Sequence, residues 1–160
     1  MGVLITRTAL VRAILKVIKI KEVEELKHLE VVAGIIIYKD LILCMERGQG
    51  KFDYVSFKYE FPGGKVEPGE KNSQALMREL REEMALNVNI SEDDFFYTVN
   101  HQYPDFQITM HSFLCHVDNQ EFVMKEHVDF KWLPLDQLHT LTWAPADQPI
   151  VEELIKRGIS

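Results

Sequence analysis

The segment from Glu60 to Leu86, EFPGGKVEPGEKNSQALMRELREEMAL, constrains the fold more than any other part of the chain. It begins with glycines and prolines, which permit tight turns and oppose regular structure. From Asn72 onward no glycine or proline occurs until well past Leu86. We therefore expect a helix capped by Asn72 or Ser73, with a shaped loop leading directly into it.

Three glutamates crowd this helix in the string RELREE. At about 100° per residue, Glu79, Glu82 and Glu83 share an arc of about 100°, whereas Arg78 and Arg81 are expected to point away from the acids. Like charges at helical spacing repel by roughly 0.2–0.5 kcal/mol per pair. One interpretation is a solvated acidic face. The other is a site in which carboxylates and loop carbonyls hold a hard divalent cation, Mg²⁺ or Mn²⁺.

Apolar runs of strand-like pattern alternate with turn residues through much of the remaining chain. They predict two hairpins, a short strand and a closing helix: residues 30–47 turning at Lys39-Asp40, residues 95–117 turning at residues 103–106, residues 130–135, and residues 146–158. Residues 48–59 are expected to form a loop.

The segment Gly64 to Leu86 resembles the Nudix box of the MutT-like pyrophosphohydrolases, GX5EX7REUXEEXGU with U aliphatic. The positions that match are Gly64, Glu70, Arg78, Glu79, Leu80, Glu82, Glu83 and Leu86. Ala85 stands where the pattern has glycine. Glycine there would form a left-handed helix end, so alanine should cost on the order of 1 kcal/mol or move the helix end toward Asn87.

The resemblance covers roughly residues 29–157 and implies the Nudix fold. That fold is α+β, an α/β/α sandwich in which a mixed β-sheet is flanked by helices and the box forms a loop-helix-loop. We accordingly expect two regions, a basic N-terminal extension at residues 1–28 and a Nudix domain at residues 29–160.

The resemblance also implies a metal site. Glu79, Glu82 and Glu83, with the carbonyl of Gly63, should hold Mg²⁺, with Mn²⁺ as a possible substitute. Glu126 in MKEHVD resembles the distant acid that MutT-type enzymes bring back as metal ligand or base, and a surface loop charge is the alternative. The general base stays open among Glu79, Glu83 and Glu126.

Other box residues are expected to shape the site. Gly64, Glu70 and Arg78 form its structural part, and Glu70 and Arg78 should orient the box by pairing. Lys65 and Arg47 are the expected phosphate contacts, with ordinary surface charge as the alternative for each.

The implied reaction is attack by metal-activated water on a nucleoside triphosphate, which releases a nucleoside monophosphate and pyrophosphate. The string APAD, which ends at Asp147, resembles the equivalent part of the bacterial CTP pyrophosphohydrolases. An ionised aspartate only accepts hydrogen bonds and so complements the exocyclic amine of cytosine. Cytosine nucleotides (CTP, dCTP, 5-methyl- or 5-hydroxy-dCTP) are therefore the preferred substrates.

Three alternatives stay open. An aspartate can also bind the N1 and N2 hydrogens of an oxidised guanine, which would make the chain an 8-oxo-dGTP pyrophosphatase of MutT type. Asp147 can instead be a plain helix N-cap. A non-catalytic regulatory Nudix domain that binds nucleotides is an alternative of another class.

The rest of the substrate site is expected from the loops around the box. Glu60, Phe61, Gly63 and Phe106 complete the predicted substrate-binding set. A base-stacking partner is expected among the aromatic residues Phe52, Tyr54, Phe57, Tyr59, Phe106 and Trp143.

The formal charge of −7 argues against a nucleic-acid binder, because phosphate backbones are held by basic patches. Cys44 and Cys115 sit in apolar runs and are expected to be reduced and buried, which fits a cytoplasmic protein. The expected partner is a small-molecule nucleotide, with no stable membrane association, and the chain should be a monomer or a homodimer.

The first 28 residues carry six Lys or Arg against three Glu. Within them Arg12, Lys16 and Lys19 fall at helical spacing, which predicts a basic amphipathic helix. Arg12 and Lys16 interrupt the apolar stretch, so a secretory signal is not expected. The helix is either peripheral or a contact for a membrane surface or a partner.

Overall fold

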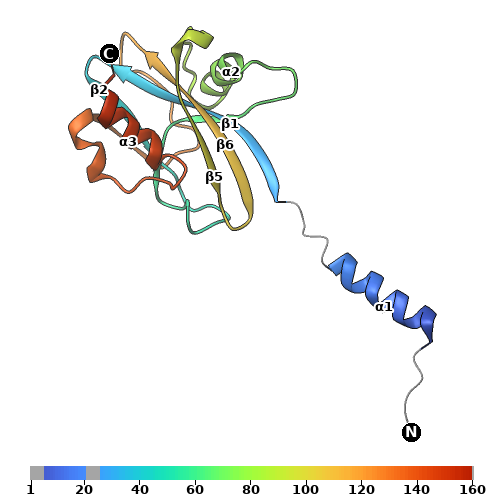
Figure 1. Ribbon diagram of the computed structural model, residues 1–160. Coiled ribbons are helices and arrows are strands. Elements are labelled where there is room, and N and C mark those ends of the chain that lie inside the picture. The colour runs from blue at the N-terminus through green and yellow to red at the C-terminus, as the bar shows by residue number, and fades with distance from the viewer. Residues whose placement is uncertain (1–5, 21–25, 160) are drawn as a thin grey trace.

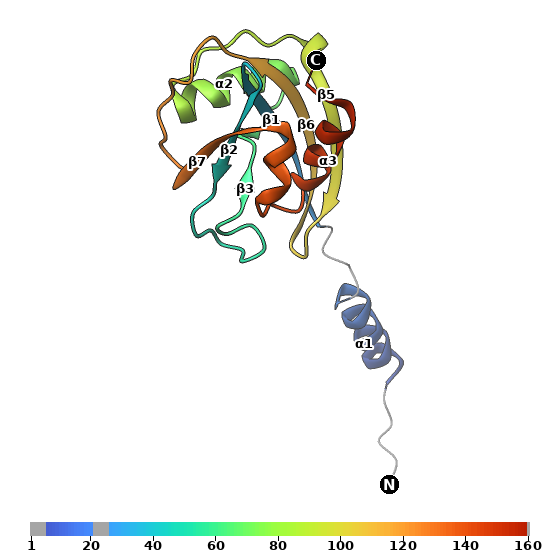
Figure 2. The same cartoon turned by 90° about the vertical axis from the view of Figure 1, so that its left-hand side faces the viewer.

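The computed structural model describes residues 6–20 and 26–159. Within them a mixed sheet of seven strands lies between helices α2 (Asn72–Met84) and α3 (Gln148–Arg157). Figures 1 and 2 show these two helices on opposite faces of the sheet. The predicted α/β/α sandwich is confirmed.

The centre of the sheet is β1 (Lys27–Tyr38), which pairs in parallel with β6 (Phe106–His116) along most of its length. The main strand order is β3-β2-β1-β6-β5, while β4 pairs with β1 and β7 pairs with β2. The remaining bounds are β2 (Leu41–Glu46), β3 (Tyr59–Glu60), β4 (Gly63–Lys65), β5 (Phe95–Gln102) and β7 (Asp129–Pro134), with short 3-10 helices η1 (Glu92–Asp94) and η2 (Leu135–Thr140).

The sheet is buried on both faces, which explains the uninterrupted apolar run of β1. Val31, Ile35 and Ile37 pack into the core that includes residues of α3. Val32 and Ile36 pack into the core beneath α2. Both predicted hairpins, the short strand and the closing helix are therefore present, and Cys44 and Cys115 are free and buried.

The glycine loop differs from expectation because it contributes two short strands, β3 and β4. β4 lies antiparallel to β1, with Gly63 opposite Ala33. A Cβ built on Gly63 would overlap the carbonyl oxygen of Val32. The glycine therefore lets the loop backbone approach β1 closely enough to pair with it.

The start of α2 corrects one prediction. The N-cap is Lys71, so neither Asn72 nor Ser73 caps the helix. The backbone N–H of Lys71 donates to Gln74 Oε1 at 3.1 Å, and that of Ser73 donates to Glu92 Oε1 at 3.0 Å. The side chains of Gln74 and Glu92 thus satisfy donors near the helix start.

The end of α2 lies at Ala85, where the Nudix pattern has glycine. Ala85 has φ 50° and ψ 30°, a left-handed conformation that costs a residue with a Cβ. Its N–H donates to Arg81 O at 3.1 Å, and the N–H of Leu86 donates to Leu80 O at 3.2 Å. The helix end has not moved toward Asn87, and Ala85 itself adopts the strained left-handed conformation.

We expect Ala85→Gly to raise the free energy of unfolding by about 0.5–1 kcal/mol, because glycine adopts this conformation without the Cβ penalty. Urea unfolding at constant pH measures the change. Arg81→Gly, inside the last turn of the same helix, is the matched control and should lower stability by about 1 kcal/mol. A loss of stability in Ala85→Gly would contradict the expectation.

Helix α1 (Arg7–Ile20) lies within the predicted N-terminal extension. Residues 1–5 and 21–25 of the predicted extension lie outside the described residues. No helix in the described part of the chain is long and apolar enough to cross a membrane.

Candidate active site

Helix α2 holds Glu79 directly against the glycine loop. A Cβ built on Gly64 would overlap the carboxyl group of Glu79, so a larger residue at this position would displace that carboxyl group. The side chain of Glu79 is 13% exposed, and its Oε1 accepts from Arg78 Nη1 at 2.9 Å. The loop and the helix therefore share one packed contact at the carboxylate.

Arg78 connects the acids of this region. Its Nε and Nη2 donate to the two carboxylate oxygens of Glu70, both at 2.9 Å, which is the expected pair. Its Nη2 also donates to the backbone carbonyl of Lys65 at 2.9 Å. These charge-assisted bonds hold the pKa of Glu70 at about 2, chiefly through Arg78 and secondarily through the backbone of Glu67.

The prediction that Arg78 points away from the acids was wrong. Its Nη1 also lies 3.3 Å from Glu82 Oε2. The guanidinium is long enough to cross the helix surface toward Glu70 and the loop carbonyl, and the acids lie on that path. Glu82 itself is 59% exposed on its side chain.

Glu83 is the centre of the acidic cluster. Burial, with the neighbouring carboxylates of Glu126 and Glu79, raises the pKa of Glu83 to about 8, and its carboxyl group is within hydrogen-bonding reach of both. The fold thus brings together the three predicted site acids Glu79, Glu83 and Glu126.

The loop of residues 117–128 delivers Glu126 to this cluster. The N–H of Val123 donates to Met84 O at 2.9 Å, and Lys125 Nζ donates to Glu82 O at 3.1 Å. Both acceptors are carbonyls in the last turn of α2, which have no partner within the helix. The negative end of the helix dipole also favours the charged amine of Lys125 there. The helix end therefore positions the loop that carries the distant acid.

The donor set fits a hard divalent cation. Glu79, Glu83 and Glu126 offer carboxylate oxygens, the ligands that Mg²⁺ prefers. The neighbouring carboxylates help to raise the pKa of Glu83, and a bound cation would lower that pKa again. Within residues 6–20 and 26–159, the side-chain positions form no group of three or more acidic, histidine or cysteine residues that could by itself hold a metal ion. Gly63 lies in β4, directly before the box.

A second cluster surrounds Asp147. This side chain is buried, and its Oδ1 accepts from the N–H of Phe61 at 3.0 Å. Burial and the nearby Glu60 raise the pKa of Asp147 well above its ordinary range. Glu60 in turn accepts from His127 Nε2 at 2.9 Å and lies 3.4 Å from Arg47 Nη1.

Asp147 occupies the N-cap position of α3, but its side chain makes no capping bond. The segment before α3 is instead tied to β3, because Tyr59 N donates to Thr142 O at 2.9 Å and Ala144 N donates to Tyr59 O at 2.8 Å. This pairing aims the carboxyl group at Phe61 rather than at the first turn of its helix.

Sequence reasoning missed His127, whose side chain is only 8% exposed. It follows Glu126 directly, but its partner Glu60 lies far away in sequence, on β3. The available signal was the string EH beside the predicted distant acid.

The aromatic candidates divide into two groups. Tyr59 and Trp143 are core residues, and Trp143 stacks on Phe61 with ring centroids 4.7 Å apart. Phe52, Tyr54 and Phe106 instead gather around the buried ring of Tyr103.

Tyr103 links this aromatic group to the Asp147 cluster, because its hydroxyl accepts from Ala146 N at 3.0 Å. Phe57 stays 58% exposed and has a left-handed φ of 56°. Lys65 is exposed on β4.

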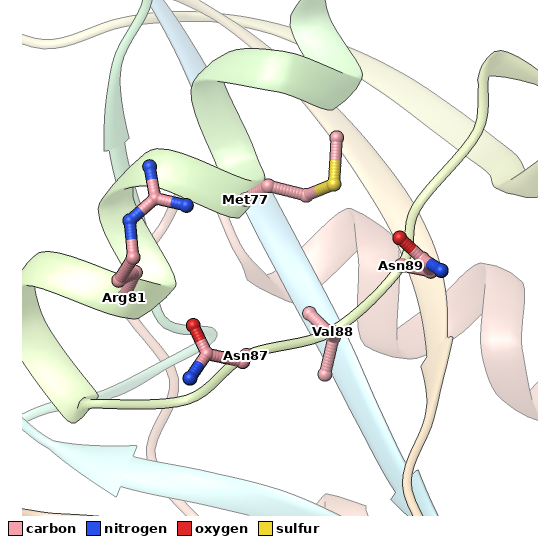
Figure 3. Close-up of a pocket in the computed structure, with 5 residues that line it drawn as sticks. All are labelled: Met77, Arg81, Asn87, Val88 and Asn89. Carbon is pink, nitrogen blue, oxygen red and sulfur yellow. The ribbon is translucent and has the colours of Figure 1, made fainter.

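A hollow of about 380 Å³ lies on the other side of α2 from Glu79 and Glu83. Figure 3 shows Met77 and Arg81 on the helix facing the segment from Asn87 to Asn89 across it. Arg81 therefore does point away from the acids, as predicted, and this hollow contains none of the predicted site residues.

We expect the metal-free protein to lose stability as pH rises from about 4.5 to about 8. The folded pKa of Glu83, about 8, lies above its ordinary value of 4.5, so in this window the folded state keeps a proton that the unfolded state has released. Glu83→Gln should flatten this decline in urea unfolding measured across the window. Glu67→Gln, on an exposed neighbour, is the control and should keep the wild-type slope; equal slopes for both variants would contradict the expectation.

Known proteins are similar to this chain over most of its length. Residues 28–154 match the NUDIX domain. The chain is 35% identical over 129 residues to a CTP pyrophosphohydrolase of Escherichia coli K12, covering 79% of this chain and 91% of that protein. It is 32% identical over 131 residues to an 8-oxo-dGTP diphosphatase of the same organism, covering 81% and 98%. The solution structure of the E. coli ORF135 protein superposes with a TM-score of 0.68 at 30% identity, covering 84% of this chain and 96% of that chain.

Proposed function

Because the chain belongs to the NUDIX domain family and is one of its nucleotide pyrophosphohydrolases, we propose that it hydrolyses nucleoside triphosphates and prefers cytosine nucleotides. The products would be a nucleoside monophosphate and pyrophosphate. The observation that carries the catalytic part is the convergence of the Glu79, Glu83 and Glu126 carboxyl groups beside the glycine loop.

In this proposal Glu79, Glu83 and Glu126 hold a divalent cation, Mg²⁺ or in its place Mn²⁺, together with Glu82 and the carbonyl of Gly63. The bound cation supplies neutralisation of phosphate charge and a lower pKa for water. One of the site carboxylates accepts the proton of the attacking water, a contribution of typically about 10²–10⁴-fold. The bond that breaks joins the monophosphate to the pyrophosphate, which leaves with the electron pair.

The phosphate contacts would come from two cations near the loop. Arg47 lies beside Glu60, at the Asp147 cluster. Lys65 extends from β4, two residues after Gly63. Both are exposed, as groups that meet an incoming polyphosphate must be.

The preference for cytosine rests on the buried carboxyl group of Asp147. One of its oxygens accepts from Phe61 N, so the other can accept from the exocyclic amine of the base. Glu60 adds a second acceptor beside Asp147, held by His127 and Arg47. Two neighbouring carboxyl groups would suit a base that presents N–H donors.

An oxidised guanine also presents N–H donors, at N1 and N2. The similarity to an 8-oxo-dGTP diphosphatase makes this nucleotide the second candidate substrate. The two candidates share the metal site and differ only in the base pocket.

A nucleotide panel tests the proposal. With Mg²⁺, we expect more pyrophosphate release from CTP, dCTP, 5-methyl-dCTP and 5-hydroxy-dCTP than from 8-oxo-dGTP. A chelator should abolish pyrophosphate release from every nucleotide, because carboxylates without a cation cannot neutralise the triphosphate. Adding Mg²⁺ back in excess should restore the rate, and Mn²⁺ tests the substitute. Faster release from 8-oxo-dGTP would favour the second substrate. Nucleotide binding without turnover would favour a regulatory domain.

A further inference from the structure

Helix α1 divides into two faces of different chemistry. At about 100° per residue, its apolar side chains cover an arc of about 160°, and two cations share an arc of about 40° opposite them. The apolar set is Leu10, Val11, Ile14, Leu15 and Val17, and the cationic set is Arg12 and Lys16.

The apolar face is not covered by the described part of the protein. Its five apolar side chains are each 48–55% exposed. Neither core cluster contains a residue of α1. The match to the NUDIX domain begins at residue 28, beyond this helix, so the sandwich does not account for its pattern.

The charge of α1 is opposite to that of the rest of the chain. The helix contains Arg7, Arg12, Lys16 and Lys19 and no acidic residue, a charge of +4. The whole chain carries −7, which leaves −11 outside the helix. Its binding partner should therefore be an anionic surface that also accepts an apolar face.

We propose that α1 docks the protein reversibly onto an anionic lipid bilayer, with the helix axis in the plane of the interface. Fourteen residues span about 21 Å, which is too short to cross a hydrocarbon core of about 30 Å. Apolar residues on one face and cations on the other are the pattern of interfacial helices. Docking of this kind adds a location to the nucleotide hydrolase and is independent of its proposed substrate.

The position of Arg7 argues for a bilayer over a second copy of this helix. Arg7 lies at the middle of the apolar arc, so pairing two apolar faces would bury this cation or place it against another helix of charge +4. At a bilayer it lies in the first turn and can reach the headgroups while its stem stays among apolar groups.

Vesicle sedimentation of the full chain tests this docking. We expect it to bind phosphatidylcholine vesicles that contain about one-third phosphatidylserine, to bind pure phosphatidylcholine at least about tenfold more weakly, and to be released near 1 M salt. Absence of binding to the anionic vesicles, or equal binding to both kinds, would overturn the proposal.

Paired variants separate the two faces. Arg12→Gln with Lys16→Gln should weaken partitioning roughly 30-fold, since each basic residue near the surface contributes a few-fold to tenfold. Lys39→Gln with Lys58→Gln removes the same charge from the sandwich and should leave partitioning nearly unchanged. An equal loss in both pairs would mean that net charge alone drives binding and would overturn the role of the helix.

Leu10→Gln with Ile14→Gln removes apolar area from α1 and should also abolish sedimentation, whereas Val123→Gln, on an exposed loop, should not. Analytical ultracentrifugation of the same proteins tests the alternative occupant. One outcome would refute the lipid proposal: the wild type forms a dimer and does not bind vesicles, and the double variant Leu10→Gln with Ile14→Gln is a monomer. That outcome would assign the apolar face of α1 to a second copy of the chain. Thermal unfolding of the sandwich should be the same in all variants.

Discussion

Glu83→Gln is expected to lower turnover at least about a hundredfold while the sandwich stays folded. Glutamine keeps the shape of the side chain but has no charge for a cation and cannot serve as a base. Glu83 neighbours the carboxyl groups of both Glu79 and Glu126, so its replacement affects the whole acidic cluster. A hundredfold loss corresponds to about 2.7 kcal/mol of transition-state stabilisation.

The measurement is pyrophosphate release at saturating nucleotide and Mg²⁺. Glu67→Gln is the matched control, because Glu67 is 65% exposed and lies at the edge of the Arg78 network. It should keep nearly full activity. Thermal unfolding without metal separates lost catalysis from lost structure, since the variant should unfold no earlier than the wild type at alkaline pH. Unchanged turnover in folded Glu83→Gln would remove Glu83 from the metal site.

Asp147→Asn is expected to change the ratio of kcat/KM for CTP to kcat/KM for 8-oxo-dGTP by about tenfold or more, in favour of the purine. The Oδ1 of asparagine can still accept from Phe61 N, so the local fold should survive. The second oxygen becomes an amide that donates, and a donor opposes the amine of cytosine. The base pocket then has one acceptor fewer and one donor more.

This ratio is best measured at alkaline pH, because burial and Glu60 raise the pKa of Asp147 and alkaline pH favours its ionised form. Asp136→Asn, in the exposed first turn of η2, is the control and should leave the ratio unchanged. An unaltered ratio in Asp147→Asn would refute the role of this residue in reading the base.

The order of elements and the box acids could be predicted because they depend on local sequence. Gly64 and Glu79 are separated by a short loop and about two helical turns, so their contact follows from spacing. The direction of Arg78 could not be predicted, since it depends on where the carbonyl of Lys65 and the carboxylate of Glu70 lie after the loop has folded.

Contacts between segments that are distant in sequence also could not be predicted from the sequence. Glu126 was identified by resemblance, but the position of its loop was not. The loop is held by hydrogen bonds to the carbonyls of Met84 and Glu82, which are free to accept them only because α2 ends there. His127 was missed because Glu60, its partner, belongs to a strand that sequence patterns had assigned to irregular structure.

The loop of residues 117–128 places consecutive side chains in two different sites. Glu126 reaches Glu83 in the acidic cluster, and His127 reaches Glu60 beside Asp147. Because the two residues are adjacent, a displacement of Glu126 on ion binding would also displace His127, which holds Glu60. Thermodynamic linkage makes such an effect mutual, so any factor by which the ion tightens nucleotide affinity is the factor by which the nucleotide tightens ion affinity.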